Sequence, residues 1–166
     1  MINDQSTIQE GKMHINSSLL YQQKVQCPCC EHLIGRYKRR ITKGMIYFLI
    51  ALYQDYMQNK AKRQDSFVFY KTIQDRVFKE TKRNVTDFVK LKAWGLIIPK
   101  AEYNEGTGLS SGYWSITQRG IAFLSGRLSV SKILYQDDRG NTISESADKV
   151  TINDYFKDFK FQDIKW

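Results

Sequence analysis

The stretch Val89-Lys-Leu-Lys-Ala-Trp-Gly-Leu-Ile-Ile98 decides the fold of the central part of the chain. Gly95 can adopt the left-handed conformation that ends a helix, so the residues before it are predicted to be helical. Leu96 to Ile98 then begins an extended segment. Pro99 restricts that segment to a sheet edge or a strand end, because proline has no amide hydrogen to donate. The sequence therefore predicts a helix that runs directly into an edge strand.

A second stretch, Tyr113-Trp-Ser-Ile-Thr-Gln-Arg-Gly-Ile-Ala-Phe-Leu124, predicts the strand that returns. Tyr113 to Ile116 has the composition of a strand, and the glycine-rich residues 104–112 before it are typical of a long hairpin loop. Thr117 is a suitable N-cap for a following helix, which Gly126 is expected to stop. We expect two strands joined by a long loop and followed by a helix.

Three helices are expected before this hairpin. Apolar residues recur at helical spacing from Met45 to Met57, with Thr42 as the N-cap. A second helix is predicted over residues 67–78, beginning near Ser66 or Phe69. A third ends at Gly95. The apolar half of its helical wheel consists of Val85, Phe88, Val89, Leu91 and Ala93. The polar half consists of Arg83, Asn84, Thr86, Asp87 and Lys90.

The two quoted stretches resemble parts of winged helix-turn-helix regulators of the MarR and PadR kind. The first resembles the end of a recognition helix with the first wing strand, and the second resembles the second wing strand with its following helix. The similarity covers about residues 42–124, half the chain. It implies an α+β winged-helix fold with three helices, a two-stranded wing and a following helix. From Cys27 onward the chain also resembles, more faintly, uncharacterised phage-encoded proteins, and that likeness carries no function.

The flanking sequence suggests four regions. Residues 1–26 are expected to be a flexible arm, residues 27–40 a cysteine-containing knuckle with a basic segment, and residues 41–126 the winged helix. Residues 127–166 are expected to form a small α/β appendage. Its predicted parts are a strand over 130–136, a turn at 137–141, a return at 142–144 and a short helix capped by Thr151. The aromatic tail, with Phe159, Phe161, Ile164 and Trp166, must be buried on the main domain or on a partner.

Positive charge is concentrated in one part of the chain. The net charge is +9, and residues 36–100 hold 16 Lys or Arg against five Asp or Glu, a balance of +11. A concentrated positive field attracts polyanions and speeds their encounter. Solubility alone would not require this asymmetry, so we favour a polyanionic partner over a merely solvated surface.

The resemblance implies that the third helix lies in the major groove of DNA. Arg83 would then pair with guanine and Asn84 with adenine, Thr86 and Asp87 would meet other base edges, and Lys90 would take a phosphate. The basic residues before the first helix fit a phosphate-tracking arm with Tyr37 interleaved; they are Arg36, Lys38, Arg39, Arg40 and Lys43. The alternative is a solvated helix start, although cations there oppose the helix dipole. The wing loop 104–112 has no Lys or Arg, so it is not expected to grip DNA.

The motif Cys27-Pro-Cys-Cys30 has the Cys-x-x-Cys spacing of a metal knuckle. Cys27, Cys30 and His32 are therefore candidate ligands of a structural zinc ion. A fourth ligand would have to come from His14 or from a second subunit, and reduced thiols in a knuckle-shaped turn are the alternative. A disulfide is not expected in a cytoplasmic chain.

Together these patterns predict a DNA-binding protein, sequence-specific or not, with a regulatory role and double-stranded DNA as its partner. The alternative is a phage-type protein-interaction or virion-associated module, with a protein partner or homodimer held through the aromatic carboxy-terminal segment; RNA is a third possible partner. No enzyme is expected, because no catalytic constellation or phosphate-binding loop is visible. The amino terminus does not resemble a secretory signal and no apolar run could span a membrane, so the cytoplasm of a bacterial or phage-infected cell is the expected location.

Overall fold

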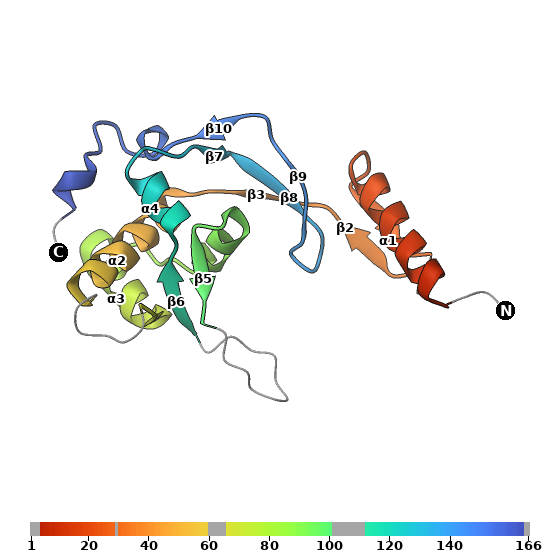
Figure 1. The fold of residues 1–166 in the computed structure, drawn as a ribbon, viewed down its shortest axis with the longest axis horizontal. Coiled ribbons are helices and arrows are strands. Elements are labelled where there is room, and N and C mark those ends of the chain that lie inside the picture. The colour runs from red at the N-terminus through yellow and green to blue at the C-terminus, as the bar shows by residue number, and fades with distance from the viewer. Residues whose placement is uncertain (1–3, 29, 60–65, 101–111, 165–166) are drawn as a thin grey trace. The chain divides into compact units, whose positions relative to one another are not determined.

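The computed structural model describes residues 4–28, 30–59, 66–100 and 112–164 and shows a mixed α+β protein (Figure 1). The chain divides into two compact units. We call the unit made of Met1–Arg40 and Ser131–Asp148 the sheet unit. We call the unit made of Ile41–Val130 and Lys149–Trp166 the helical unit. The chain therefore passes from one unit to the other three times.

In the helical unit, helices alternate along the chain with the strands of a three-stranded sheet. Its elements are α2 (Lys43–Asn59), β4 (Val68–Phe69), α3 (Tyr70–Thr81), the 3₁₀ helix η1 (Asp87–Trp94), β5 (Ile97–Pro99), β6 (Tyr113–Ile116) and α4 (Gln118–Leu124). Strand β6 is central and pairs antiparallel with both β4 and β5. Val68 lies opposite Trp114, and Ile97 lies opposite Ile116. The predicted strands, and the edge position of Pro99, are confirmed.

Helix α2 is the centre of this unit because eight of its 17 residues are buried. Phe48, Leu49 and Leu52 are almost fully inaccessible to solvent. The Phe48 ring stacks on Phe88 of η1 with centroids 4.1 Å apart, and Phe88 meets Trp114 of β6 edge-on at 5.6 Å. Helix and sheet are thus joined through aromatic contacts. The predicted N-cap is confirmed, since the Met45 amide donates to Thr42 Oγ1 at 3.3 Å.

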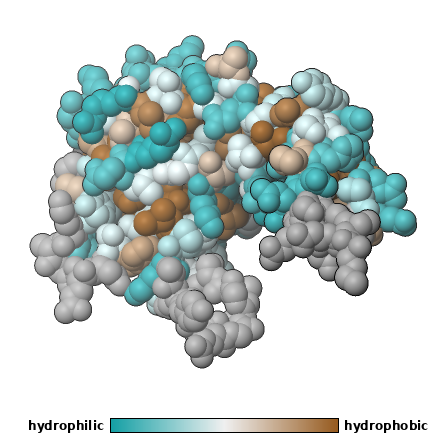
Figure 2. Space-filling model, turned by 45° about the vertical axis from the view of Figure 1, so that its right-hand side comes forward, coloured by the Kyte–Doolittle hydropathy of each residue, from teal (hydrophilic) through white to brown (hydrophobic). Residues whose placement is uncertain are grey.

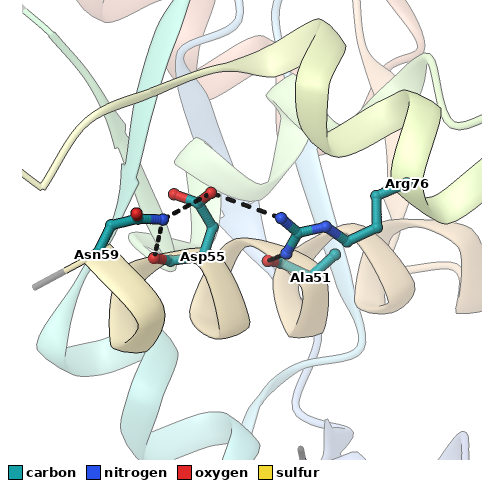
Figure 3. A network of polar contacts seen from close by, with 4 residues as sticks. All are labelled: Ala51, Asp55, Asn59 and Arg76. Atoms are coloured by element: carbon teal, nitrogen blue, oxygen red, sulfur yellow. Dashed lines mark hydrogen bonds and ion pairs between the residues drawn. The ribbon is translucent and has the colours of Figure 1, made fainter. Parts of the chain in front are cut away.

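Helices α2 and α3 are also joined by polar contacts to a buried carboxylate (Figure 3). Asp55 on α2 is 3% exposed, and Arg76 Nη2 from α3 lies 3.6 Å from its Oδ1. Arg76 Nη1 also donates to the Ala51 carbonyl at 3.4 Å, and Asn59 Nδ2 donates to Asp55 Oδ1 at 3.2 Å. The charge of Asp55 is therefore matched by hydrogen bonds and a cation, as a buried carboxylate requires.

The two stretches quoted at the outset are held together by a set of contacts that we call the clasp, formed by Trp94–Leu96 and Thr117–Gly120. The Thr117 hydroxyl donates to the Gly95 carbonyl at 2.7 Å and accepts from the Gly120 amide at 2.9 Å. The Thr117 amide donates to the Leu96 carbonyl at 3.1 Å, and Arg119 Nε donates to the Trp94 carbonyl at 2.9 Å. One side chain thus caps α4 and satisfies a carbonyl just beyond η1. The predicted N-cap at Thr117 is confirmed.

The clasp requires glycine at two positions. Gly95 has φ +69° and donates its amide to the carbonyls of Leu91 and Lys92, so it ends η1 as predicted. A Cβ on Gly120 would lie 2.3 Å from the Leu96 carbonyl oxygen, which is closer than real Cβ contacts allow. The close approach of α4 to the start of β5 therefore depends on the missing side chain of Gly120.

The prediction for the third helix is wrong in two respects. It is a 3₁₀ helix that begins at Asp87, so Arg83, Asn84, Val85 and Thr86 precede it. Its buried residues, Phe88, Leu91 and Trp94, recur every three positions, as three residues per turn require. Val89, expected on the apolar half, is 44% exposed.

The second helix, predicted to begin near Ser66 or Phe69, begins at Tyr70, because residues 68–69 form β4. Of the predicted loop 104–112, only Gly112 lies among the described residues.

The carboxy-terminal segment packs on α2 of the helical unit. Thr151 caps the 3₁₀ helix η2 (Ile152–Asp154), and a second 3₁₀ helix, η3 (Phe161–Asp163), follows. The Phe161 ring lies 5.0 Å from Tyr53 of α2. The Tyr155 hydroxyl donates to the Ile41 carbonyl at 3.3 Å, and burial, with the nearby charge of Asp154, raises the pKa of Tyr155 to about 12. An appendage over 127–166 is therefore not formed, since this segment and residues 131–148 belong to different units.

The sheet unit begins with a helix rather than with the flexible arm predicted over residues 1–26. Helix α1 (Asp4–Leu19) buries Ile15 and Leu19 against Val25, because residues four apart lie on one helix face. The unit's other elements are β1 (Lys24–Gln26), β2 (Leu33–Gly35), β3 (Tyr37–Arg40), β8 (Ile133–Gln136) and β9 (Thr142–Glu145). Strands β1 and β2 form a hairpin, and β3, β8 and β9 form an antiparallel sheet in that order. Two short strands, β7 (Val130–Ser131) and β10 (Lys149–Val150), lie where the chain passes between the units.

We expect Gly120→Ala to lower the free energy of unfolding by about 2–3 kcal/mol, because the added methyl group must displace the Leu96 backbone. Gly44→Ala is the matched control, since a Cβ at Gly44 would meet Val85 at an ordinary 3.6 Å. That change should be neutral or stabilising by up to about 1 kcal/mol, because glycine weakens a helix. Urea unfolding followed by circular dichroism measures both, and equal effects would refute the role assigned to Gly120.

Removing the Arg76 guanidinium from Asp55 should destabilise the helical unit. Arg76→Met takes this cation away from the buried carboxylate, and we expect a loss of about 2 kcal/mol, below the value for a fully buried pair because Arg76 is 27% exposed. Lys71→Met, an exposed change on the same helix, should alter stability by less than about 0.5 kcal/mol. The same urea measurement would contradict this role if the two variants unfolded alike.

Candidate nucleic-acid interface

The predicted nucleic-acid-binding residues fall into both units. Arg36, Lys38, Arg39 and Arg40 belong to the sheet unit, where residues 37–40 form β3. Lys43 is the first residue of α2 in the helical unit, together with Arg83, Asn84, Thr86, Asp87 and Lys90. The basic residues before α2 are therefore a paired strand rather than a free arm, and each unit has to be considered by itself.

The segment between α3 and η1 is anchored and presents its polar side chains outward. Lys82 ends α3 with φ +58°, and the Arg83 amide donates to Thr81 Oγ1 at 3.2 Å. Val85 is 4% exposed, and its carbonyl accepts a hydrogen bond from Gln74 Nε2. Arg83, Asn84 and Thr86 are exposed around this buried anchor. Three of the predicted contact residues are thus available on a fixed backbone.

Lys43 and Arg83 are brought together by aromatic rings. Arg83 Cζ lies 6.0 Å from the Tyr47 ring centroid, and Lys43 Nζ lies 5.9 Å from that of Phe156. The Tyr47 and Phe156 rings meet edge-on, 5.0 Å apart. In addition, Val85 packs beside Gly44 at the start of α2. We call Lys43, Tyr47, Arg83 and Phe156 the cation–aromatic cluster.

The cation–aromatic cluster is positive and unneutralised. Within the described part of the chain, neither Lys43 nor Arg83 forms an ion pair with a carboxylate. Both lie near the amino-terminal end of α2, where the helix dipole adds further positive potential. No acidic residue occupies the first turn of α2. The cluster therefore favours an anionic partner.

Asp87 and Lys90 are engaged with each other. Lys90 Nζ donates to Asp87 Oδ1 at 2.7 Å, with the Asp87 side chain 57% exposed and that of Lys90 30% exposed. The carboxylate predicted to meet a base edge is thus already bonded, and the lysine predicted to take a phosphate is partly neutralised. The pair is close enough to the surface for an anion to compete for the lysine.

Further cations of the helical unit had no role assigned from the sequence. Lys79, Lys82 and Lys92 are exposed and make no ion pair among the residues described. The excess of basic residues over 36–100 was the only sequence pattern that included them. Figure 2 shows hydrophilic side chains and apolar patches interspersed on the visible face.

In the sheet unit, the basic residues of the β3 region have different roles. The Arg36 guanidinium donates to the Leu19 carbonyl at 3.0 Å and the Leu20 carbonyl at 2.6 Å, so it binds the carboxy-terminal end of α1. Arg39 lies 5.3 Å from the Tyr37 ring. Lys38 and Arg40 are exposed. Of these four basic residues, Arg36 thus has a structural role in binding the end of α1, whereas Lys38 and Arg40 are exposed to solvent.

The cysteine-containing turn connects β1 and β2. The Cys27 amide donates to the His32 carbonyl at 2.8 Å, and the Glu31 amide donates to the Cys27 carbonyl at 2.9 Å. Cys27, Cys30 and His32 contribute to the lining of a cavity of about 680 Å³ within the sheet unit. Among the residues with described positions, which exclude Cys29, no three His, Cys, Asp or Glu side chains converge enough to hold a metal ion. The predicted zinc ligand set is therefore not assembled there.

Comparison with models of protein families, with curated proteins and with solved structures finds no match to this chain. No helix in the described ranges is long and apolar enough to cross a membrane. The function has to be inferred from the geometry and charge of the residues themselves.

Proposed function

We propose that the helical unit is a winged-helix domain that binds double-stranded DNA and serves a regulatory role. The proposal is supported by the order of helix, strand, helix, short helix, strand, strand and helix, with the last strand between the other two. The observation that carries the proposal is the cation–aromatic cluster. It fixes Lys43 and Arg83, both without a carboxylate partner among the described residues, beside an exposed polar segment.

In this proposal the segment between α3 and η1 approaches the DNA together with the start of α2. Lys43 and Arg83 contact phosphates, while Asn84 and Thr86 reach base edges or sugar oxygens from the anchored backbone beside them. The 3₁₀ helix η1 is short, and Asp87 is bonded to Lys90, so few side chains are placed to read bases. Phosphate contacts should therefore supply most of the affinity, which makes binding strongly salt-dependent.

The packing of the carboxy-terminal segment favours DNA over a protein partner. Phe161, part of the aromatic tail expected to hold a partner or a second copy, contacts Tyr53 of α2 instead, and the preceding Phe156 contacts Tyr47. Duplex RNA is also disfavoured as the ligand, because its deep and narrow major groove excludes side chains. Because these aromatic side chains already pack on α2, the charged residues are what remains for a partner, and they suit a phosphate backbone better than an apolar protein surface.

The double variant Lys43→Gln/Arg83→Gln should bind duplex DNA at least tenfold more weakly at low salt. Two lost phosphate contacts should also reduce the slope of log affinity against log salt by about 1.8. Fluorescence anisotropy with a labelled duplex over a salt series measures both quantities. Arg127→Gln/Lys160→Gln, which removes two exposed cations elsewhere in the same unit, should bind almost as the unaltered protein does. Absence of duplex binding at low salt, or equal losses in both double variants, would reject the proposal.

Asp87→Asn should strengthen duplex binding. The change removes a negative charge and releases Lys90 for a phosphate, and one added contact predicts a salt slope steeper by about 0.9. Asp158→Asn is the control, because it removes an equal charge from the carboxy-terminal segment and should leave the slope unchanged. A slope for Asp87→Asn equal to that of the unaltered protein would exclude Lys90 from the interface.

A further inference from the structure

The register of β3 and β8 sorts the side chains of the sheet unit onto two faces. Residues directly opposite one another in antiparallel strands project to the same side. Lys38 lies opposite Tyr135 and Arg40 opposite Ile133, and we call these four residues the open face. The alternating residues project to the other side, where Leu134 is 1% exposed. The open face is the solvent side, since Lys38 and Arg40 are exposed and Tyr135 is half-buried.

Acidic groups are on the other side of this sheet. Asp138 hydrogen-bonds to Tyr37, which raises the pKa of that tyrosine, and accepts from the Gly35 amide at 3.2 Å. Glu145 lies opposite Leu134 and accepts a hydrogen bond from Ser131. On the open face, β9 instead places Ser144 opposite Tyr135. Lys38 and Arg40 have no ion-pair partner within the described ranges, so the open face carries uncompensated positive charge.

Tyr135 is held in place on β8, directly opposite Lys38. The Arg36 guanidinium lies 4.1 Å from its ring centroid and is itself fixed by the Leu19 and Leu20 carbonyls. An aromatic ring stacked against a fixed guanidinium is a pre-organised platform, because neither group has to lose much freedom when a ligand arrives. The platform lies directly opposite the exposed Lys38, and the exposed Arg40 follows two residues further along the same face of β3.

We propose that the open face binds a single strand of DNA, with phosphates on Lys38 and Arg40 and a base stacked on Tyr135. Side chains two residues apart on a strand are about 7 Å apart, close to the distance between neighbouring phosphates of an extended strand. A stacking platform beside a row of cations selects unpaired bases, because bases inside a duplex have no free face. The open face consists of residues of the sheet unit, whereas the proposed duplex contacts come from the helical unit; only the choice of DNA over RNA rests on the proposed function.

The test uses the full-length protein with three labelled probes: oligo(dT), oligo(U) and a DNA duplex of the same length. Lys38→Gln/Arg40→Gln should bind oligo(dT) at least tenfold more weakly, with a salt slope reduced by about 1.4. Tyr135→Leu should weaken binding of oligo(dT) by about fivefold to a hundredfold, whereas Tyr135→Phe, which keeps a stacking ring, should bind it normally. Fluorescence anisotropy supplies the affinities.

Two control variants separate this surface from other cations. Lys132→Gln/Arg139→Gln removes two exposed cations of the sheet unit that are not on the open face, and should bind oligo(dT) normally. Lys43→Gln/Arg83→Gln should lose duplex binding but keep oligo(dT), so a failure of the helical-unit proposal is distinguishable from a failure here.

Three results would overturn the proposal: unchanged oligo(dT) binding by Lys38→Gln/Arg40→Gln, tighter binding of oligo(U) than of oligo(dT), or equal losses for Tyr135→Phe and Tyr135→Leu. Circular dichroism checks that each variant is folded. If Tyr135→Leu does not fold, the exposed pair Lys38 and Arg40 decides the question alone.

Discussion

The hydroxyl of Thr117 is the group on which the arrangement of the helical unit depends most. It donates to the carbonyl of Gly95 and accepts from the amide of Gly120, so it connects the end of one helix to the beginning of another. Strand β5 begins two residues after Gly95, and β6 ends at the residue before Thr117. The Thr117–Gly95 hydrogen bond therefore lies at the end of the β5–β6 pairing. With η1 fixed in this way, Phe88 can reach Phe48 and Trp114, and the preceding segment is held against α2.

The features that the sequence predicted correctly are those decided by one residue and its neighbours. Thr42 and Thr117 were predicted as caps because a hydroxyl can accept from the amide two or three residues ahead, and Gly95 as a helix end because it tolerates positive φ. Helix α1 was missed since its sequence is mostly polar, with Ile15 and Leu19 the main buried positions among those described. The 3₁₀ geometry of η1 was missed because a spacing of three between apolar residues also suits an α-helix.

The division into units could not be predicted, because the pairing of β3 with β8 joins residues far apart in the sequence and leaves no local pattern. The same limit applies to the candidate site. The charge count located the basic region, but tertiary contacts decide which cations remain available. Arg36 hydrogen-bonds to carbonyls at the end of α1, and Lys90 forms an ion pair with Asp87. Lys43 and Arg83 are brought together by the rings of Tyr47 and Phe156, one of which comes from the distant carboxy-terminal segment.

The threefold passage of the chain between units has a consequence for synthesis on the ribosome. Strand β3 is made before α2, whereas its partner β8 is made only after α4, so β3 has no partner while the elements from α2 to α4 emerge. Unpaired strands are prone to join other chains, and lysine or arginine on such a strand counteracts this. Lys38, Arg39 and Arg40 are residues of this kind, and they lie on the strand that waits longest for its partner.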